Sequence, residues 1–390
     1  MARWNSTDNG AIYSLSAPGT PFMTQPLILL GAGHAHVHVL AQLARHPLAD
    51  TDVTLIAPHP RQLYSGMVPG FVAGHYTLDD CTIPLEPLVK ASGVRWLARQ
   101  VVAMDAHART VRLDDGSELG YEWLSINTGP VQLREQIEAR MPGACEFGLF
   151  VRPIEMFGNL WPSVTERGAT QALRISVIGA GAAGVELAMA MRHALPVAAV
   201  TLITGGGPAA SGYAPALQRL VAAALKQRAV TVLCDTAESL GRGELLLGSG
   251  ARLACDVPVI ATGAQAPAWV QGSGLALDAQ GFVKVNACLR TISHPNVFAA
   301  GDVATRVDRA IPRSGVYAVR AGPALAANLG AATSGAQLLA HQPPQRSLNL
   351  LSCGDGHAIA SWGTFAAQGR WAWWLKDRID RGFIARYRTM

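Results

Sequence analysis

A short apolar strand that runs into a glycine-rich turn occurs twice in this chain of 390 residues. The first copy is Leu27–Leu30 followed by Gly31-Ala-Gly-His-Ala-His36, and the second is Ile175–Ile178 followed by Gly179-Ala-Gly-Ala-Ala-Gly184. The helices and second strands that follow are expected at His38–Arg45, Val53–Ile56, a stretch ending at His193, and Val200–Ile203. Each copy is one βαβ unit, so the sequence predicts an α/β fold with two dinucleotide-binding domains.

The first turn has two of the three residues that such a turn needs. Gly31 permits the sharp exit from the strand, and Gly33 lets a pyrophosphate approach the backbone at the helix N-terminus. The third position is His36, where a small residue normally allows helix and strand to pack closely. We expect His36 to be an ordinary histidine at a helix start, while His34 is equally open to a phosphate contact. No carboxylate follows the second strand, which ends Ile56-Ala-Pro58.

The second turn is complete, with Gly179, Gly181 and Gly184 in place. The strand after it ends Leu202-Ile-Thr-Gly205, which offers neither a carboxylate for NADH nor an arginine for the 2′-phosphate of NADPH. A domain that keeps this fold and binds nothing therefore remains an alternative.

Composition excludes several classes of protein. With 49% hydrophobic and 15% charged residues, the chain is not mainly disordered, and a net charge of +5 does not favour nucleic acid. No run of about 18 residues is free of charges and helix breakers, so no transmembrane helix is expected. The six cysteines form no CxxC pair and show no zinc spacing, which argues against a disulfide framework or a metal site. Residues 1–25 are expected to be a disordered tail, or to precede a true start at Met23, in a cytoplasmic protein.

Three further motifs connect the fold to a family. Leu124-Ser-Ile-Asn-Thr-Gly129 and Val259-Ile-Ala-Thr-Gly263 end in Thr-Gly, and His294-Pro-Asn-Val-Phe-Ala-Ala-Gly-Asp302 resembles the second FAD fingerprint of flavoproteins. In order and content the chain resembles the pyridine nucleotide–disulfide oxidoreductase superfamily over residues 24–388. Tyr64-Ser-Gly-Met-Val-Pro-Gly70 replaces the redox cysteine pair of disulfide reductases.

The details resemble the branch of type II NADH dehydrogenases and sulfide:quinone reductases. Four motifs are similar to a sub-branch whose members are sometimes fused to selenide, water dikinase: Gly33–His36, Tyr64–Gly70, Gly315–Arg320 and Lys376–Arg381. The resemblance implies two Rossmann-like domains, an FAD domain with an inserted NAD(P)H domain, and a small C-terminal segment. The implied limits are 26–150 and 285–341 for the FAD domain, 151–284 for the NAD(P)H domain, and 346–390 for the C-terminal segment.

The resemblance also implies site residues. Asp302 would bind the ribityl chain of FAD, Tyr64 would lie against the isoalloxazine, and Glu186 would lie near the nicotinamide–flavin junction. A helix over Pro312–Leu325 would direct its N-terminus at the flavin, with Arg313 beside it. Ordinary loop packing for Tyr64, a helix-start carboxylate for Glu186 and a solvated side chain for Arg313 stay open. The cofactor-binding set is Gly31, Gly33, His34, Gly66, Thr128, Gly129, Gly179, Gly181, Gly184, Thr262, Gly263, Gly301, Asp302 and Arg313.

The expected function is an FAD-dependent oxidoreductase that takes hydride from NADH or NADPH and passes electrons to a quinone or small acceptor. One alternative is an oxidoreductase of sulfur or selenium species that uses Cys145 and Cys353. Another is a flavin-binding sensor or partner module without turnover, which the missing acids at Ala57 and Thr204 keep open.

The C-terminal residues 370–390 predict an amphipathic helix. Basic residues outnumber acidic ones there, and a single apolar stripe is expected from Trp371, Trp374, Leu375, Ile379, Phe383 and Tyr387. Such a helix suits a peripheral contact with the inner face of a membrane. The alternatives are packing on the FAD domain or on a second subunit of a homodimer. Gly382 is expected to weaken the helix by roughly 1 kcal/mol relative to Ala.

Overall fold

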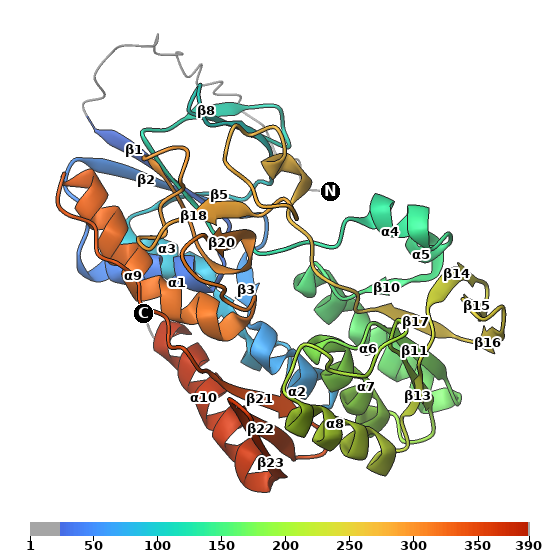
Figure 1. Ribbon diagram of the computed structural model, residues 1–390. Helices are drawn as coiled ribbons and strands as arrows, with labels where there is room; N and C mark the ends of the chain where they lie inside the picture. Colours follow the sequence, from blue (N-terminus) through green and yellow to red (C-terminus); the bar gives the residue numbers. More distant parts are fainter. Residues whose placement is uncertain (1–23, 389–390) are drawn as a thin grey trace, which may run out of the picture.

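The computed structural model describes residues 24–388, and its two parallel five-stranded sheets confirm the predicted pair of βαβ units (Figure 1). The first sheet has the order β19-β9-β1-β2-β5. Its strands are β1 Gln25–Leu30, β2 Thr51–Ile56, β5 Arg95–Leu97, β9 Trp123–Ile126 and β19 Val297–Ala299. The helices of this unit are α1 His34–Arg45, α2 Val68–Val72, α3 Leu85–Ser92 and α9 Gly315–Thr333. All five strands run parallel, which brings their carboxyl ends to one edge.

Smaller strands surround the first sheet. The antiparallel meander consists of β6 Val101–Asp105, β7 Thr110–Leu113 and β8 Glu118–Gly120, and a turn at residues 114–117 joins its last two strands. Two short pairs are β3 Arg61–Leu63 with β4 Thr82–Pro84, and β18 Val283–Val285 with β20 Ala304–Arg306. Helix α1 begins at His34 rather than His38, because the turn already ends at Gly33. Helix α9 begins at Gly315 rather than Pro312, since Ser314 is still extended.

The second sheet has the order β10-β17-β11-β12-β13. Its strands are β10 Leu149–Phe150, β11 Arg174–Ile178, β12 Ala199–Ile203, β13 Thr231–Leu233 and β17 Val257–Ile260. The helices are α4 Arg134–Arg140, α5 Ala144–Phe147, α6 Ile154–Thr170, α7 Ala182–Ala194 and α8 Pro215–Gln227, and the hairpin strands are β14 Ala237–Gly241, β15 Glu244–Leu247 and β16 Arg252–Ala254. Helix α7 begins directly after Gly181, so the third glycine of the turn, Gly184, already lies in the helix.

The chain crosses between the two units at one place. Val131 and Gln265 form an antiparallel bridge in which each backbone N–H donates to the other's carbonyl, at 2.9 and 2.8 Å. Met141 and Ala144 already pack with the core of the second sheet, and Val270 and Leu275 pack with the first. The bridge therefore lies where the packing changes from the core of one sheet to the core of the other.

The C-terminal segment lies across both units (Figure 1). It holds an antiparallel sheet that the sequence analysis did not anticipate, followed by a long helix: β21 Leu348–Ser352, β22 Ala358–Trp362, β23 Phe365–Gly369 and α10 Arg370–Arg388. The sheet contacts α7 and α8, while α10 contacts β4 and α1. Helix α10 continues through Gly382. Among the residues described, no helix has the length and apolar character needed to cross a bilayer.

Candidate dinucleotide and electron-transfer site

The two glycines of the first turn are needed because strand β9 ends directly against them. A Cβ at Gly31, where φ is +82°, would lie 2.6 Å from Thr128 Cα, and a Cβ at Gly33 would collide with Asn127. Thr128 thus lies beside the turn, and cofactor binding by Thr128 and Gly129 stays a prediction. The chain around the neighbouring Thr-Gly segment therefore occupies the space where side chains at these two glycines would lie.

Asn127 connects three segments at this edge of the sheet. Its side-chain oxygen accepts the backbone N–H groups of Ala35 and His36 at 3.0 and 3.1 Å, and its amide donates to the carbonyl of Ala300 at 2.6 Å. A Cβ at Gly301 would lie 2.8 Å from the same amide. Asn127 therefore fixes the start of α1 against the Gly-Asp motif. The role of Asn127 depends on contacts between distant segments, which the motif around it does not reveal.

The second turn leaves more room than the first. A Cβ at Gly179 would lie 2.6 Å from the carbonyl of Ala261, and one at Gly184 would collide with the carbonyl of Gly179. A Cβ at Gly181 would have no neighbour within 4 Å, and the same holds at Gly263. No side chain caps the N-terminus of α7. The open space at Gly181, in front of an uncapped helix, matches what a pyrophosphate requires.

Asp302 and two arginines lie where the units meet. Burial raises the pKa of Asp302 above its usual value, although the guanidinium groups of Arg152 and Arg313 act in the opposite direction. Arg152 follows β10, and its guanidinium makes no hydrogen bond within residues 24–388. Arg313 donates to Thr305 at 2.7 Å and to Asp278 at 3.1 Å, and stacks on a phenyl ring. Arg152 had no signal in the sequence, because its position depends on a turn between the units.

Buried polar atoms without a partner test whether dinucleotides fit these turns. Within the described part of the chain, such atoms include His34 Nε2, Thr204 Oγ1, Thr262 Oγ1 and Ser314 Oγ. His34 is the first residue of α1, directly after the first turn, and Ser314 precedes α9. Thr204 and Thr262 follow strands of the second sheet. Because buried polar groups are normally satisfied, these four atoms indicate ligands that supply hydrogen bonds. The residues present therefore fit a dinucleotide at each turn.

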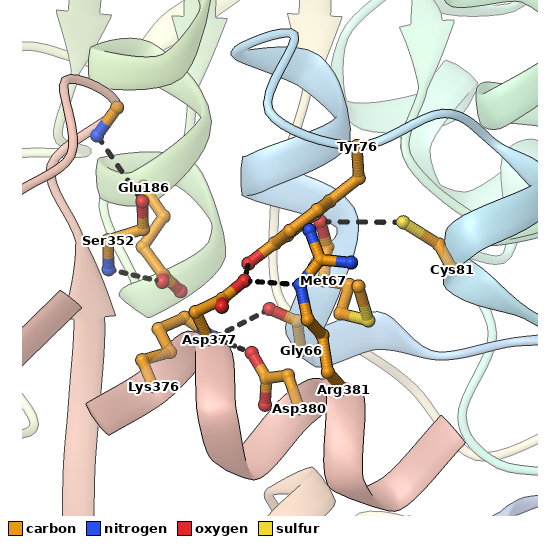
Figure 2. A network of polar contacts seen from close by, with 11 residues as sticks. Gly66, Met67, Tyr76, Cys81, Glu186, Ser352, Lys376, Asp377, Asp380 and Arg381 are labelled. Carbon is orange, nitrogen blue, oxygen red and sulfur yellow. Dashed lines mark hydrogen bonds and ion pairs between the residues drawn. The ribbon is translucent and has the colours of Figure 1, made fainter. Parts of the chain in front are cut away.

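A polar cluster joins α10 to α7 and to the loop that begins at Tyr64 (Figure 2). Lys376 Nζ donates to the carbonyl of Gly66 at 2.6 Å and to Asp380 at 2.7 Å. Glu186, on α7, accepts the backbone N–H of Ser352 at 2.7 Å. Lys376 and Asp380 are one helical turn apart in the motif Lys376–Arg381, but their spacing alone does not reveal this contact with a distant loop.

The charged groups of this cluster change one another's pKa values. Burial raises the pKa of Glu186 to about 7, against the opposing effect of Lys376 and of the Ser352 N–H. Burial would lower the pKa of Lys376, but Asp380 and Glu186 together raise it above its usual value. Burial and Asp380 raise the pKa of Tyr64. The cluster thus holds a lysine that stays charged beside a glutamic acid that exchanges its proton near neutral pH.

An aromatic column connects the first turn to α10. The His34 ring lies 5.3 Å from that of Tyr64, and Tyr64 stacks on Phe383 at 4.5 Å. A Cβ at Gly66 would lie 2.9 Å from the Tyr64 ring. Burial lowers the pKa of His34 to about 4, so the imidazole is neutral at physiological pH. Tyr64 and His34 therefore belong to one packed group, while their contact with a cofactor stays a prediction.

Helix α10 has two apolar faces, so the prediction of a single stripe is wrong. Phe383 and Tyr387 are buried, at 6% and 3% exposure. Trp371, Trp374 and Ile379 lie at 53%, 59% and 47% exposure. At about 100° per residue, Trp371 and Trp374 fall on the side of the helix opposite Phe383 and Tyr387, and Ile379 lies at the border between the two sides. One side packs on the first unit, as the alternative reading expected, and the other side is open.

The cysteines give no support to a redox pair. All six are free. Cys353 is buried, and burial raises the pKa of its thiol to about 12. Cys145 is exposed on α5, where its N–H and thiol bond Glu138 and Arg134, and its pKa is also raised. The electrostatic neighbours of Cys353 are Arg228, Asp355 and Glu186, so the two thiols share no surroundings.

Two parallel-sheet units, each with a glycine turn that leads from a strand into a helix, define a two-dinucleotide-domain flavoprotein fold. The family model for pyridine nucleotide-disulphide oxidoreductases matches residues 25–322. The chain belongs to this family, and it is an oxidoreductase of the NADH dehydrogenase-like kind.

Known relatives and structures agree with this assignment. An NADH dehydrogenase-like protein of Mycobacterium tuberculosis is 26% identical over 302 residues, which are 71% of this chain and 72% of that protein. A demethylphylloquinone reductase of a Synechocystis species is 24% identical, over 71% of each chain. The fold matches the sulfide:quinone oxidoreductase of Aquifex aeolicus, with a TM-score of 0.76, 19% identity and coverage of 94% and 92%. It also matches NDH2 of Plasmodium falciparum in complex with NADH, with a TM-score of 0.77, 13% identity and coverage of 94% and 98%.

Proposed function

We propose that this chain oxidises NADH or NADPH through bound FAD and delivers the electrons to a quinone at a membrane surface. The observation that carries the proposal is α10, which has Lys376 and Asp380 against the Tyr64–Gly70 loop on one side and exposed tryptophans on the other. The helix thereby connects the proposed cofactor site to a surface suited to lipid.

The first turn would hold FAD, and the second would hold the nicotinamide cofactor. Asp302 would accept hydrogen bonds from the ribityl hydroxyls of FAD. The neutral His34 would donate a hydrogen bond from Nε2 to the same cofactor. The open backbone at Gly181 would receive the pyrophosphate of NAD(P)H. When bound, FAD would supply the redox chemistry by accepting hydride and releasing electrons. The chain's own groups bind, orient and neutralise charge.

Glu186 would handle the proton that accompanies quinone reduction. Its pKa of about 7 lets the carboxyl group bind a proton and release it near neutral pH. Lys376 stays charged and holds its position through Asp380 and the Gly66 carbonyl. Tyr64, beside Asp380, keeps its phenolic proton, because burial raises its pKa.

The acceptor would arrive from a membrane. Trp371, Trp374 and Ile379 on α10 are exposed together with Trp362 and Phe365 of the β22–β23 hairpin, and Phe365 is 79% exposed. Arg378 lies over the Trp374 ring. Aromatic and basic side chains together suit an anionic lipid surface. The name of the Synechocystis relative, a demethylphylloquinone reductase, supports a lipid-soluble quinone.

Anaerobic titration of the purified protein tests the proposal. NADH or NADPH should bleach the visible flavin absorbance, and a naphthoquinone should restore it. A colourless protein without releasable FAD would contradict the proposal. If the flavin is bleached but the quinone does not reoxidise it, a quinone is not the electron acceptor. If neither NADH nor NADPH reduces the bound flavin, the result favours a flavin-binding sensor without turnover.

A further inference from the structure

The two glycine turns solve the same packing problem in different ways. In the second turn the third position is Gly184, where a Cβ would collide with the carbonyl oxygen of Gly179. In the first turn this position is His36, and its Nδ1 lies 2.6 Å from the carbonyl oxygen of Gly31. The corresponding carbonyl therefore meets a hydrogen-bond donor in the first turn and a close-packed glycine in the second.

The second ring nitrogen of His36 fixes the orientation of the ring. Nε2 lies 2.8 Å from Ser125 Oγ on β9, and the residue has no exposed surface. Because a carbonyl can only accept, Nδ1 carries the hydrogen and the Ser125 hydroxyl donates to Nε2. Burial lowers the pKa of His36 to about 4, so this neutral arrangement holds throughout the physiological range.

Holding the Gly31 carbonyl also sets the direction of an N–H group. In a trans peptide the C=O and the following N–H point in opposite directions. With the Gly31 oxygen turned inward to His36, the Ala32 N–H points to the other side of the turn. The N–H of Gly33 donates to Asn127, whereas that of Ala32 has no acceptor within residues 24–388. A free, oriented N–H at this place in the turn is available to an anion.

We propose that His36 is a positioning residue of the first dinucleotide site, which orients the Ala32 N–H toward the pyrophosphate of FAD by holding the Gly31 carbonyl. The inference rests on the proposed function for the identity of the ligand. It gives a role to the residue that departs from the glycine pattern, and it distinguishes this turn from the second one, where no side chain acts on the carbonyl.

The test measures FAD binding to full-length protein from which flavin has been removed. His36→Leu deletes both hydrogen bonds and should weaken FAD binding about tenfold. His36→Asn places an amide donor near the position of Nδ1 and should stay within about threefold of wild type. His38→Leu makes the same change two residues further along α1, away from the turn, and should leave the affinity unchanged. The ³¹P resonances of bound FAD should shift in His36→Leu and not in His36→Asn.

Each outcome decides the proposal. NADH binding at the second turn, followed by nicotinamide fluorescence, should be equal in all variants and reports that the fold is intact. If His36→Leu loses NADH binding and is therefore misfolded, His36→Ala is tested in its place and should show the same loss of FAD affinity. If neither variant folds, the proposal is overturned. Equal FAD affinity and unchanged ³¹P resonances in His36→Leu also overturn it. A wild-type protein that binds no FAD would overturn the proposed function as well, whereas the other outcomes would not.

Discussion

Lys376 and Gly66 lie 310 residues apart in the chain, yet Lys376 Nζ donates to the Gly66 carbonyl at 2.6 Å. The same ammonium group forms a 2.7 Å ion pair with Asp380, whose exposure is 4%. The last helix is therefore part of the wall beside the Tyr64–Gly70 loop, and its removal would uncover that loop.

Lys376→Met should destabilise the protein strongly. It leaves the buried Asp380 carboxylate without its partner, which costs about 3–5 kcal/mol in comparable sites. The double variant Lys376→Met with Asp380→Leu should recover much of this loss, because no charge then remains buried. Chemical denaturation measures both, and Arg378→Met on the exposed side of α10 is the control. Equal stability of Lys376→Met and wild type would contradict the buried ion pair.

Glu186→Gln should flatten the pH dependence of stability. The pKa of Glu186 is raised to about 7 in the folded protein, so the folded state binds the proton more tightly than the unfolded state. This contribution is present at low pH and is lost as the pH rises from the unfolded pKa to about 7. Because the Glu186 side chain is partly exposed, solvent reduces the full effect. We therefore expect this group to change the free energy of unfolding by about 1–2 kcal/mol between pH 5 and pH 8. Parallel stability profiles for wild type and Glu186→Gln would exclude the raised pKa.

Gly181→Val should abolish reduction by NADH and leave FAD bound. A Cβ at Gly181 has open space around it, so the fold tolerates the change while the side chain fills the place of the pyrophosphate. Gly184→Val is the matched comparison, since its Cβ would collide with the Gly179 carbonyl and should impair folding itself. Stopped-flow reduction and thermal unfolding separate the two effects. Normal NADH kinetics in a folded Gly181→Val protein would exclude this turn as the nicotinamide site.

Asp302→Ala should weaken FAD binding about ten- to a hundredfold. A hydrogen bond to a charged group contributes roughly 1.5–3 kcal/mol, and Asp302 is half-buried, close to the guanidinium groups of Arg152 and Arg313. Asp302→Asn keeps an acceptor oxygen and should lose less. Flavin fluorescence during dilution of the holoprotein gives the affinities. Retention of FAD at wild-type strength by Asp302→Ala would show that this residue does not hold the cofactor.

Trp371→Ser with Trp374→Ser should reduce binding to anionic liposomes and leave FAD content unchanged. Both side chains lie on the open side of α10, at 53% and 59% exposure, so their loss does not disturb the packed side. Phe383→Ser, on the buried side, should instead loosen the Tyr64 stack. Sedimentation with vesicles measures the partition, and equal partition of the double variant and wild type would exclude this face as the membrane contact.

Local patterns predicted the parts of the fold that depend on neighbouring residues. The strand predicted at Val200–Ile203 and the helix predicted to end at His193 agree within one residue with β12 and α7, because apolar periodicity and turn residues define them. The glycine turns were predictable for the same reason, since each is a single run of six residues.

Contacts between distant segments were not predictable in this way. The stripe on α10 was misread, because spacing alone does not tell which apolar residues meet Tyr64 and which meet solvent. Asn127, Arg152 and Lys376 act on segments far away in sequence. The His36 bond to Gly31 spans only five residues, but it depends on a ring orientation that Ser125 of β9 fixes.

The bridge between Val131 and Gln265 has a consequence for how such proteins diversify. Because the entry and exit of the second unit are hydrogen-bonded side by side, the intervening 133 or so residues form one continuous insertion with adjacent ends. Under the proposed function, in which this unit holds the nicotinamide cofactor, replacing the insertion alone would change the electron donor and keep the strand order of the first sheet. The replacement must still present an apolar helix face to α2, where α7 now packs, and this requirement limits which units can be grafted.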